Sequence, residues 1–236
     1  MQTTKTFIAS ILTCFITFQA SAEVIQVSND SGSFELHSNG MNLFNHSSPE
    51  LSTSDLAYVH STLNSSGVTT NGKITLLPVH TSQGLSFVTL IDQEYGGGDT
   101  GANATLGVTS TASSSLGMFI NDSAYDTWQL IQPPFGSQTL GATFVWDSAA
   151  SGDGFAWTNL LMGDSFSYSF VDIDTSGAID AEAFQFVGWS NDSWGVVSTN
   201  GFKVDGSSVF TGMVIPVPPT AALLSAFAFG YRRRRH

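Results

Sequence analysis

The stretch Ser165-Phe166-Ser167-Tyr168-Ser169-Phe170 alternates a small polar residue with a large aromatic one at every step. Successive side chains of a β-strand point to opposite faces of a sheet, so a strand here places its rings on one face and its hydroxyls on the other. The same alternation recurs in residues 33–37 and at Phe184 and Phe186. These stretches predict strands of a sheet that has one buried and one solvated face.

Turn-forming residues separate the further β-rich stretches of the chain. Gly96-Gly97-Gly98, Pro133-Pro134 and Asn200-Gly201 are examples of this punctuation. Helix signals are nearly absent, and residues 52–63 are the one segment that favours a short helix. The pattern predicts an all-β fold, an antiparallel β-sandwich of jelly-roll-like form, flanked by an N-terminal signal helix and a C-terminal membrane helix.

The central part of the chain is strongly acidic. All 19 acidic residues lie between Glu23 and Asp205, and Lys73 and Lys203 are the two basic residues of that span, which leaves a formal charge of −17. Such a charge repels phosphate backbones, so nucleic acid is not expected as a partner. Because 42% of the chain is hydrophobic and only 11% is charged, we expect a packed domain solvated by neutral polar residues.

The first 22 residues have the order of a secretory signal peptide. An apolar run over residues 7–18 is shorter than the ~20 residues that a membrane-spanning helix needs. Ala20 and Ala22 supply the small-x-small pattern that a signal peptidase accepts. We therefore expect a signal peptide over residues 1–22, cleavage before Glu23 and export of the mature chain.

The C-terminal end has three parts in a fixed order. A proline-rich stretch over residues 215–219 disfavours helix, an apolar stretch follows over residues 220–231, and an arginine cluster follows that. Arginines after an apolar run are held on the cytoplasmic side of a membrane. The cluster consists of Arg232, Arg233, Arg234 and Arg235.

This tail resembles the sorting signal of the PEP-CTERM family of exported bacterial proteins, with Val-Pro-Pro where the type pattern has Pro-Glu-Pro. The resemblance implies recognition by an exosortase, an integral-membrane protease, and a location at the cell surface, in the outer envelope or outside the cell. It assigns recognition to Pro216, Val217, Pro218 and Pro219, and a cytoplasmic stop to the four arginines. The expected organisation is a signal peptide over 1–22, an exported domain over 23–212 and a sorting tail over 213–236.

An acidic segment that follows the alternating stretch resembles an EF-hand calcium loop. Asp172, Asp174, Ser176 and Asp180 stand at positions one, three, five and nine, whereas position twelve is alanine and Glu182 falls one residue early. Two interpretations remain open. The segment is either a loose calcium site on these five residues or an acidic β-hairpin turn at its Ser-Gly pair. No other cofactor is expected.

Two tryptophans are candidates for binding sugar. Trp189 and Trp194 flank Asn191 and Asp192, and indole faces beside amide and carboxylate groups suit sugar rings. The same indoles are equally suited to core packing, because a domain of this size needs large side chains in its interior. An exposed, co-planar pair would favour sugar binding.

A third motif, Gly163-Asp164-Ser165-Phe166-Ser167, resembles the nucleophile block of the GDSL esterases. No histidine follows it before the tail to act as the base, so it predicts a Gly-Asp turn that leads into a strand, and no catalytic residue is assigned.

The sequence therefore predicts an exported protein, anchored at the surface or processed by an exosortase, whose non-catalytic β-sandwich acts in the extracellular matrix or envelope. A carbohydrate-binding module or a polysaccharide-acting enzyme on the same fold is the alternative. The expected partners are a signal peptidase, the exosortase, the membrane through the tail and, through the matrix role, an extracellular polysaccharide.

Overall fold

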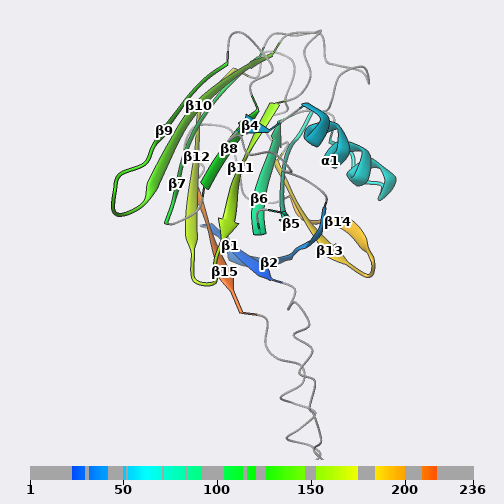
Figure 1. Ribbon diagram of the computed structural model, residues 1–236. Coiled ribbons are helices and arrows are strands. Elements are labelled where there is room, and N and C mark those ends of the chain that lie inside the picture. The colour runs from blue at the N-terminus through cyan, green and yellow to red at the C-terminus, as the bar shows by residue number, and fades with distance from the viewer. Residues whose placement is uncertain are drawn as a thin grey trace, which may run out of the picture.

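The structure is a computed structural model, and it describes residues 23–29, 32–41, 50–51, 53–70, 72–82, 84–91, 104–113, 116–120, 126–146, 153–174, 184–199 and 209–216. Within these ranges the chain forms two β-sheets and one helix (Figure 1). The prediction of an all-β fold is confirmed. The expected signal helix over 1–22 and the expected membrane stretch over 220–231 lie outside the described residues.

Sheet A has seven strands, and every neighbouring pair in it is antiparallel. Their spatial order is β2 (Gly32–His37), β1 (Val24–Asn29), β15 (Val209–Ile215), β12 (Ser165–Asp174), β7 (Ala104–Ala112), β10 (Gln138–Trp146) and β9 (Thr127–Ile131).

Sheet B has eight strands and is mixed. Its path runs through β14 (Ser193–Ser198), β13 (Phe184–Ser190), β5 (Ile74–Thr81), β6 (Gly84–Ile91), β11 (Asp153–Leu160), β8 (Leu116–Ile120) and β4 (Glu50–Leu51), and β3 (Asn39–Gly40) pairs with β5. The expectation of purely antiparallel sheets is wrong here, since β13 and β3 run parallel to β5, and β4 runs parallel to β8. For β13 the cause is a change of sheet, because the strand before it belongs to sheet A.

The two sheets pack face to face over an aromatic core. Phe166, Tyr168 and Phe170 of β12 are buried there, while the serines between them point to the other face. The ring of Phe166 lies 4.6 Å from that of Phe87 on β6, and Tyr168 stacks on Phe155 of β11 with centroids 5.3 Å apart. The alternation in the sequence is therefore confirmed as one buried and one solvated face.

Helix α1 (Thr53–Ser65) covers the outer face of sheet B, where the sequence favoured a helix over 52–63 (Figure 1). Val59 and Leu63 of this helix belong to a second apolar cluster together with Leu77 of β5 and Val88 of β6. Sheet B is thus buried on both faces, so the outer face of sheet A remains as the open sheet surface. Among the described helical residues, none forms a span long and apolar enough to cross a membrane.

The last strand reaches further along the chain than expected. β15 continues to Ile215, three residues past the expected domain boundary at 212, and it lies in the middle of sheet A between β1 and β12. Val214 is buried, and its backbone pairs with Ile25 of β1. The first residues assigned to the sorting tail therefore belong to the folded domain.

Candidate functional site

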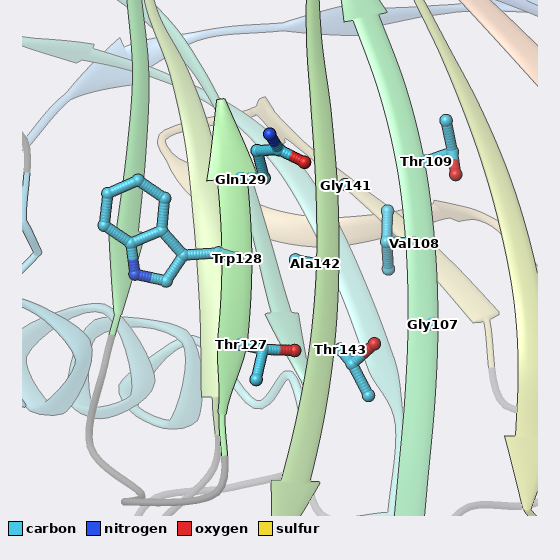
Figure 2. A pocket seen from close by; sticks show the side chains of 9 residues that line it. All are labelled: Gly107, Val108, Thr109, Thr127, Trp128, Gln129, Gly141, Ala142 and Thr143. Atoms are coloured by element: carbon cyan, nitrogen blue, oxygen red, sulfur yellow. The ribbon is translucent and has the colours of Figure 1, made fainter. Parts of the chain in front are cut away.

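A groove crosses three strands at one side of sheet A. Its volume is about 430 Å³, and strands β7, β10 and β9 form it (Figure 2). The lining residues are Gly107, Val108, Thr109, Thr127, Trp128, Gln129, Gly141, Ala142 and Thr143.

The strand register places the polar side chains of the groove in two rows. Gln129, Gly141 and Thr109 are aligned across β9, β10 and β7, and Thr127 and Thr143 begin the next row. Residues two apart on a strand point to the same face, so all of these residues lie on the outer face of the sheet. Gly141 has no side chain, and a Cβ added there meets nothing within 4 Å, so this position leaves the floor open between two hydrogen-bonding residues.

The groove offers hydrogen bonds without charge. Threonine hydroxyls donate and accept, and the Gln129 amide does both through separate atoms. None of the nine lining residues is an acid, a base or a cysteine. The groove therefore suits a neutral ligand rich in hydroxyl groups, and its lining supplies no acidic or basic side chain for proton transfer.

Trp128 stands at the rim of the groove on the edge strand β9. Its side chain is 39% exposed, and its backbone pairs with that of Ala142. Figure 2 shows the indole extending past β9, away from the hydroxyls of Thr127 and Thr143. Because side chains alternate along a strand, Trp128 points to the opposite face from Thr127 and Gln129, the face on which the buried Ala142 lies. It is partly exposed because β9 is the edge strand of sheet A.

Hydroxyl groups continue along the outer face beyond the groove. Thr139 and Ser167 flank Thr111 in the next row, and the hydroxyls of Thr111 and Ser167 are 2.6 Å apart. Adjacent strands are ~4.8 Å apart, so these residues form a regular polar surface that extends the hydrogen-bonding capacity of the groove.

The two tryptophans singled out from the sequence pack under α1. Trp194 is 3% exposed and belongs to the second apolar cluster, against which Trp189 packs. Their rings meet at an interplanar angle of 72°, with centroids 5.4 Å apart. The pair is neither co-planar nor open at Trp194, so its geometry matches the core-packing alternative.

The acidic segment follows β12. β12 lies in sheet A and β13 in sheet B, so these two strands do not pair with each other. The expected turn at the Ser-Gly pair lies outside the described residues, and both interpretations of the segment stay predictions. Asp172 and Asp174 are backbone positions of β12, whereas Ser176, Asp180 and Glu182 lie outside the described residues. Among the residues that the structure describes, no group of three or more His, Cys, Asp or Glu is placed to hold a metal.

The Gly-Asp motif is a turn, as expected. Gly163 has φ of 87°, and the Asp164 carboxylate accepts hydrogen bonds from the Leu161 amide at 2.9 Å and the Ser113 hydroxyl at 3.2 Å. The backbone amide of Ser165 donates to the same Ser113 hydroxyl at 3.0 Å. Asp164 therefore closes the turn between β11 and β12, which explains the motif by structure alone.

Two buried titratable side chains have shifted pKa values. Burial beside sheet B lowers the pKa of His60 to about 4, and its Nδ1 lies 2.8 Å from the Thr70 hydroxyl. Burial also raises the pKa of Tyr168, in the core between the sheets, and the Thr89 hydroxyl lies against it. Both side chains are neutral at physiological pH and contribute to packing.

The expected processing sites lie at the two ends of the described chain. Glu23, where the mature chain is expected to begin, and Pro216 are described, and Ala20, Ala22, residues 217–219 and the four arginines are not. Val24 pairs directly with Ile215. The two ends of the folded domain therefore lie side by side.

Sequence reasoning did not find the groove. Thr109, Thr127 and Thr143 read as ordinary solvated positions of three strands, and their sequence positions do not reveal that they are neighbours. The signal present was a polar residue at every second position with a glycine at 141, which marks a gap in the row. No family model, curated protein or solved structure matches the chain.

Proposed function

We propose that this chain is an exported, non-catalytic protein of the extracellular matrix or outer envelope, and that its jelly-roll-like β-sandwich binds a neutral polysaccharide in the groove on sheet A. The signal peptide and the PEP-CTERM-like tail support export and membrane sorting by an exosortase. The groove favours the binding module over a purely structural role.

The observation that carries the binding proposal is the composition of the groove. Its hydroxyl and amide groups match the donors and acceptors of a sugar chain. A volume of about 430 Å³ lies in the usual range of ligand sites, ~300–1,000 Å³.

Charge narrows the ligand class. The central part of the chain carries −17 and the groove itself carries no basic residue, so an acidic polysaccharide is repelled without compensation. A neutral polysaccharide is not subject to this electrostatic repulsion. Hydrolysis of a glycosidic bond uses a pair of carboxyl groups, and the groove lining holds none, which supports binding without catalysis.

Filling the groove tests the binding proposal. In Gly141→Leu the new Cβ meets no protein atom within 4 Å and the longer side chain projects into the groove, so we expect loss of binding with little change in stability. Gly195→Leu on β14 is the matched control, because a Cβ there also meets nothing within 4 Å and the residue lies outside the groove. Calorimetric titration with neutral polysaccharides such as dextran and a β-glucan, and with acidic alginate, gives the readout. Equal binding by both variants, or a preference for alginate, would refute the proposal.

Export and sorting are tested separately. N-terminal sequencing of the mature protein is expected to begin at Glu23, and replacement of the four terminal arginines by serine is expected to release unprocessed protein from the membrane fraction, because each arginine resists entry into lipid by roughly 2.5–3.5 kcal/mol. A mature chain that begins at Met1, or retention unchanged by the replacement, would contradict this part of the proposal.

A further inference from the structure

Both ends of the folded domain leave it at one pole. Val24 pairs with Ile215, so Glu23 and Pro216 lie next to each other. The Glu23 carboxylate lies 3.1 Å from Nε2 of His80 at the end of β5, which ties sheet A to sheet B at the same pole.

The turn between β11 and β12 is attached to this pole. The Gly163 amide donates to the Val214 carbonyl at 3.0 Å, and the Val214 amide donates to the Asp164 carbonyl at 2.9 Å. These bonds fix the turn against the last residues of β15. We call the end of β15, Glu23 and the turn from Leu161 to Asp164 the terminal pole.

Large apolar side chains are exposed at the terminal pole. Leu161 is 58% exposed and Met162 is 66% exposed at the tip of the turn, where small or polar residues are usual. Met213 on β15 is half-exposed. It directly precedes Val214, whose backbone is hydrogen-bonded to this turn. Phe135, 91% exposed, lies at the tip of the β9–β10 hairpin, which points to the same end because Gln138 is in the row of Gly212. Grouped apolar exposure of this kind marks an interaction surface.

The position of the tail identifies the partner as a lipid bilayer. The apolar stretch of the tail is expected to begin at Thr220, four residues after Pro216, and four extended residues span at most ~14 Å. A domain tethered this closely has its terminal pole against the bilayer surface. Glu23 and Asp164 are acidic, so the contact depends on apolar side chains and does not need anionic lipid.

We propose that Leu161 and Met162 dip into the interfacial layer of the bilayer and set the orientation of the anchored domain. This inference rests on the proposed membrane tail. Val209 of β15 lies in the row of Thr109 in the groove, six residues before Ile215, so strand geometry places the groove roughly 20 Å from the terminal pole. The contact thus holds the groove away from the membrane, open to polysaccharide.

Lipid quenching of single labelled cysteines tests this orientation. The full chain carrying Cys14→Ser has no other cysteine, so one new cysteine carries an environment-sensitive fluorophore. Met162→Cys reports the terminal pole, Tyr58→Cys on α1 is a control of similar accessibility at 46% exposure, and Phe227→Cys reports insertion of the tail. Each labelled chain is reconstituted in phosphatidylcholine vesicles with and without a quencher at the headgroup–acyl boundary.

We expect loss of emission at Met162 and Phe227 and unchanged emission at Tyr58. Quenching at Phe227 without quenching at Met162 would overturn the orientation and leave the tail proposal standing. Equal quenching at Met162 and Tyr58 would also overturn it, because the domain would then lie without a preferred face. An unquenched Phe227 would refute the membrane tail, and the orientation inferred from it would fall with it.

Discussion

Two truncated chains that differ by three residues should differ strongly in stability. One begins at Glu23 and ends at Met213, close to the boundary expected from the sequence, and the other ends at Pro216. Sequence patterns alone predict equal stability for both, because the folded domain is expected to end at residue 212. The structure predicts that the shorter chain is destabilised, because it lacks the last two residues of β15.

The contacts of Val214 set the size of the effect. Its side chain is buried, and burying a valine is worth about 1.5–3 kcal/mol. Its amide and carbonyl bond to the β11–β12 turn, and each such bond contributes about 0.5–1.5 kcal/mol. Together these terms predict a loss of about 2.5–6 kcal/mol in the free energy of unfolding. This is a large part of the ~5–15 kcal/mol free energy of unfolding of a typical domain.

Urea denaturation and thermal melting of the two chains measure this difference. For a domain of this size each kcal/mol moves the melting temperature by about 2–4 °C, so we expect the shorter chain to melt at least roughly 5 °C lower. Val214→Ala in the longer chain isolates the side-chain part and should give a smaller decrease, since the backbone bonds remain. Equal denaturation midpoints for the two truncations would show that β15 ends before Val214 and would refute the reasoning.

Two further variants test the core and the helix. In Gly212→Ala the added methyl group collides with the ring of Phe166, which lies directly over the glycine, so unfolding measurements should show a loss of about 1–3 kcal/mol, against little change for Gly195→Ala, where the space is open. The pKa of His60 is about 4 in the folded chain and near 6.5 when unfolded, so the unfolded state binds more protons between these values. Stability from this residue should therefore fall by about 1.4 kcal/mol per pH unit from pH 6.5 to 4, and denaturation of His60→Gln across that range should show a shallower pH dependence than wild type. Identical pH profiles would contradict the burial of a neutral histidine.

The alternating stretch shows how much of the fold the sequence could predict. The period of two at residues 165–170 depends only on local geometry, so it predicted both the strand and its buried face correctly. The helix over 53–65 was equally visible, because its segment lacks the β pattern and turn residues. The sequence did not show which strands belong to which sheet. Local criteria favour pairing of β12 with the next strand, and only the topology shows that β13 belongs to the other sheet.

The groove and the tryptophans depended on contacts that no local pattern contains. Trp194 is buried because α1, more than a hundred residues earlier, covers the face on which it lies. The groove exists because β7, β9 and β10 align Thr109, Gly141 and Gln129 in one row. A threonine on a solvated strand face has the same local sequence pattern whether its neighbours form a site or an ordinary surface. The strand register, which the sequence does not show, determines which of the two is present.

The place of β15 also links folding to export. β1 pairs with β2 within the first strands of the domain, but its other edge is filled by β15, whose partner residues are about 190 positions away along the chain. Closing so long a loop is slow, and until it closes sheet A lacks its centre and the aromatic core is open on one side. The domain therefore completes its fold only after β15 has emerged. Under the proposed export route, the residues after Pro216 are the part still held by the membrane at that moment, so we expect β15 to join sheet A while the chain is still attached to the membrane.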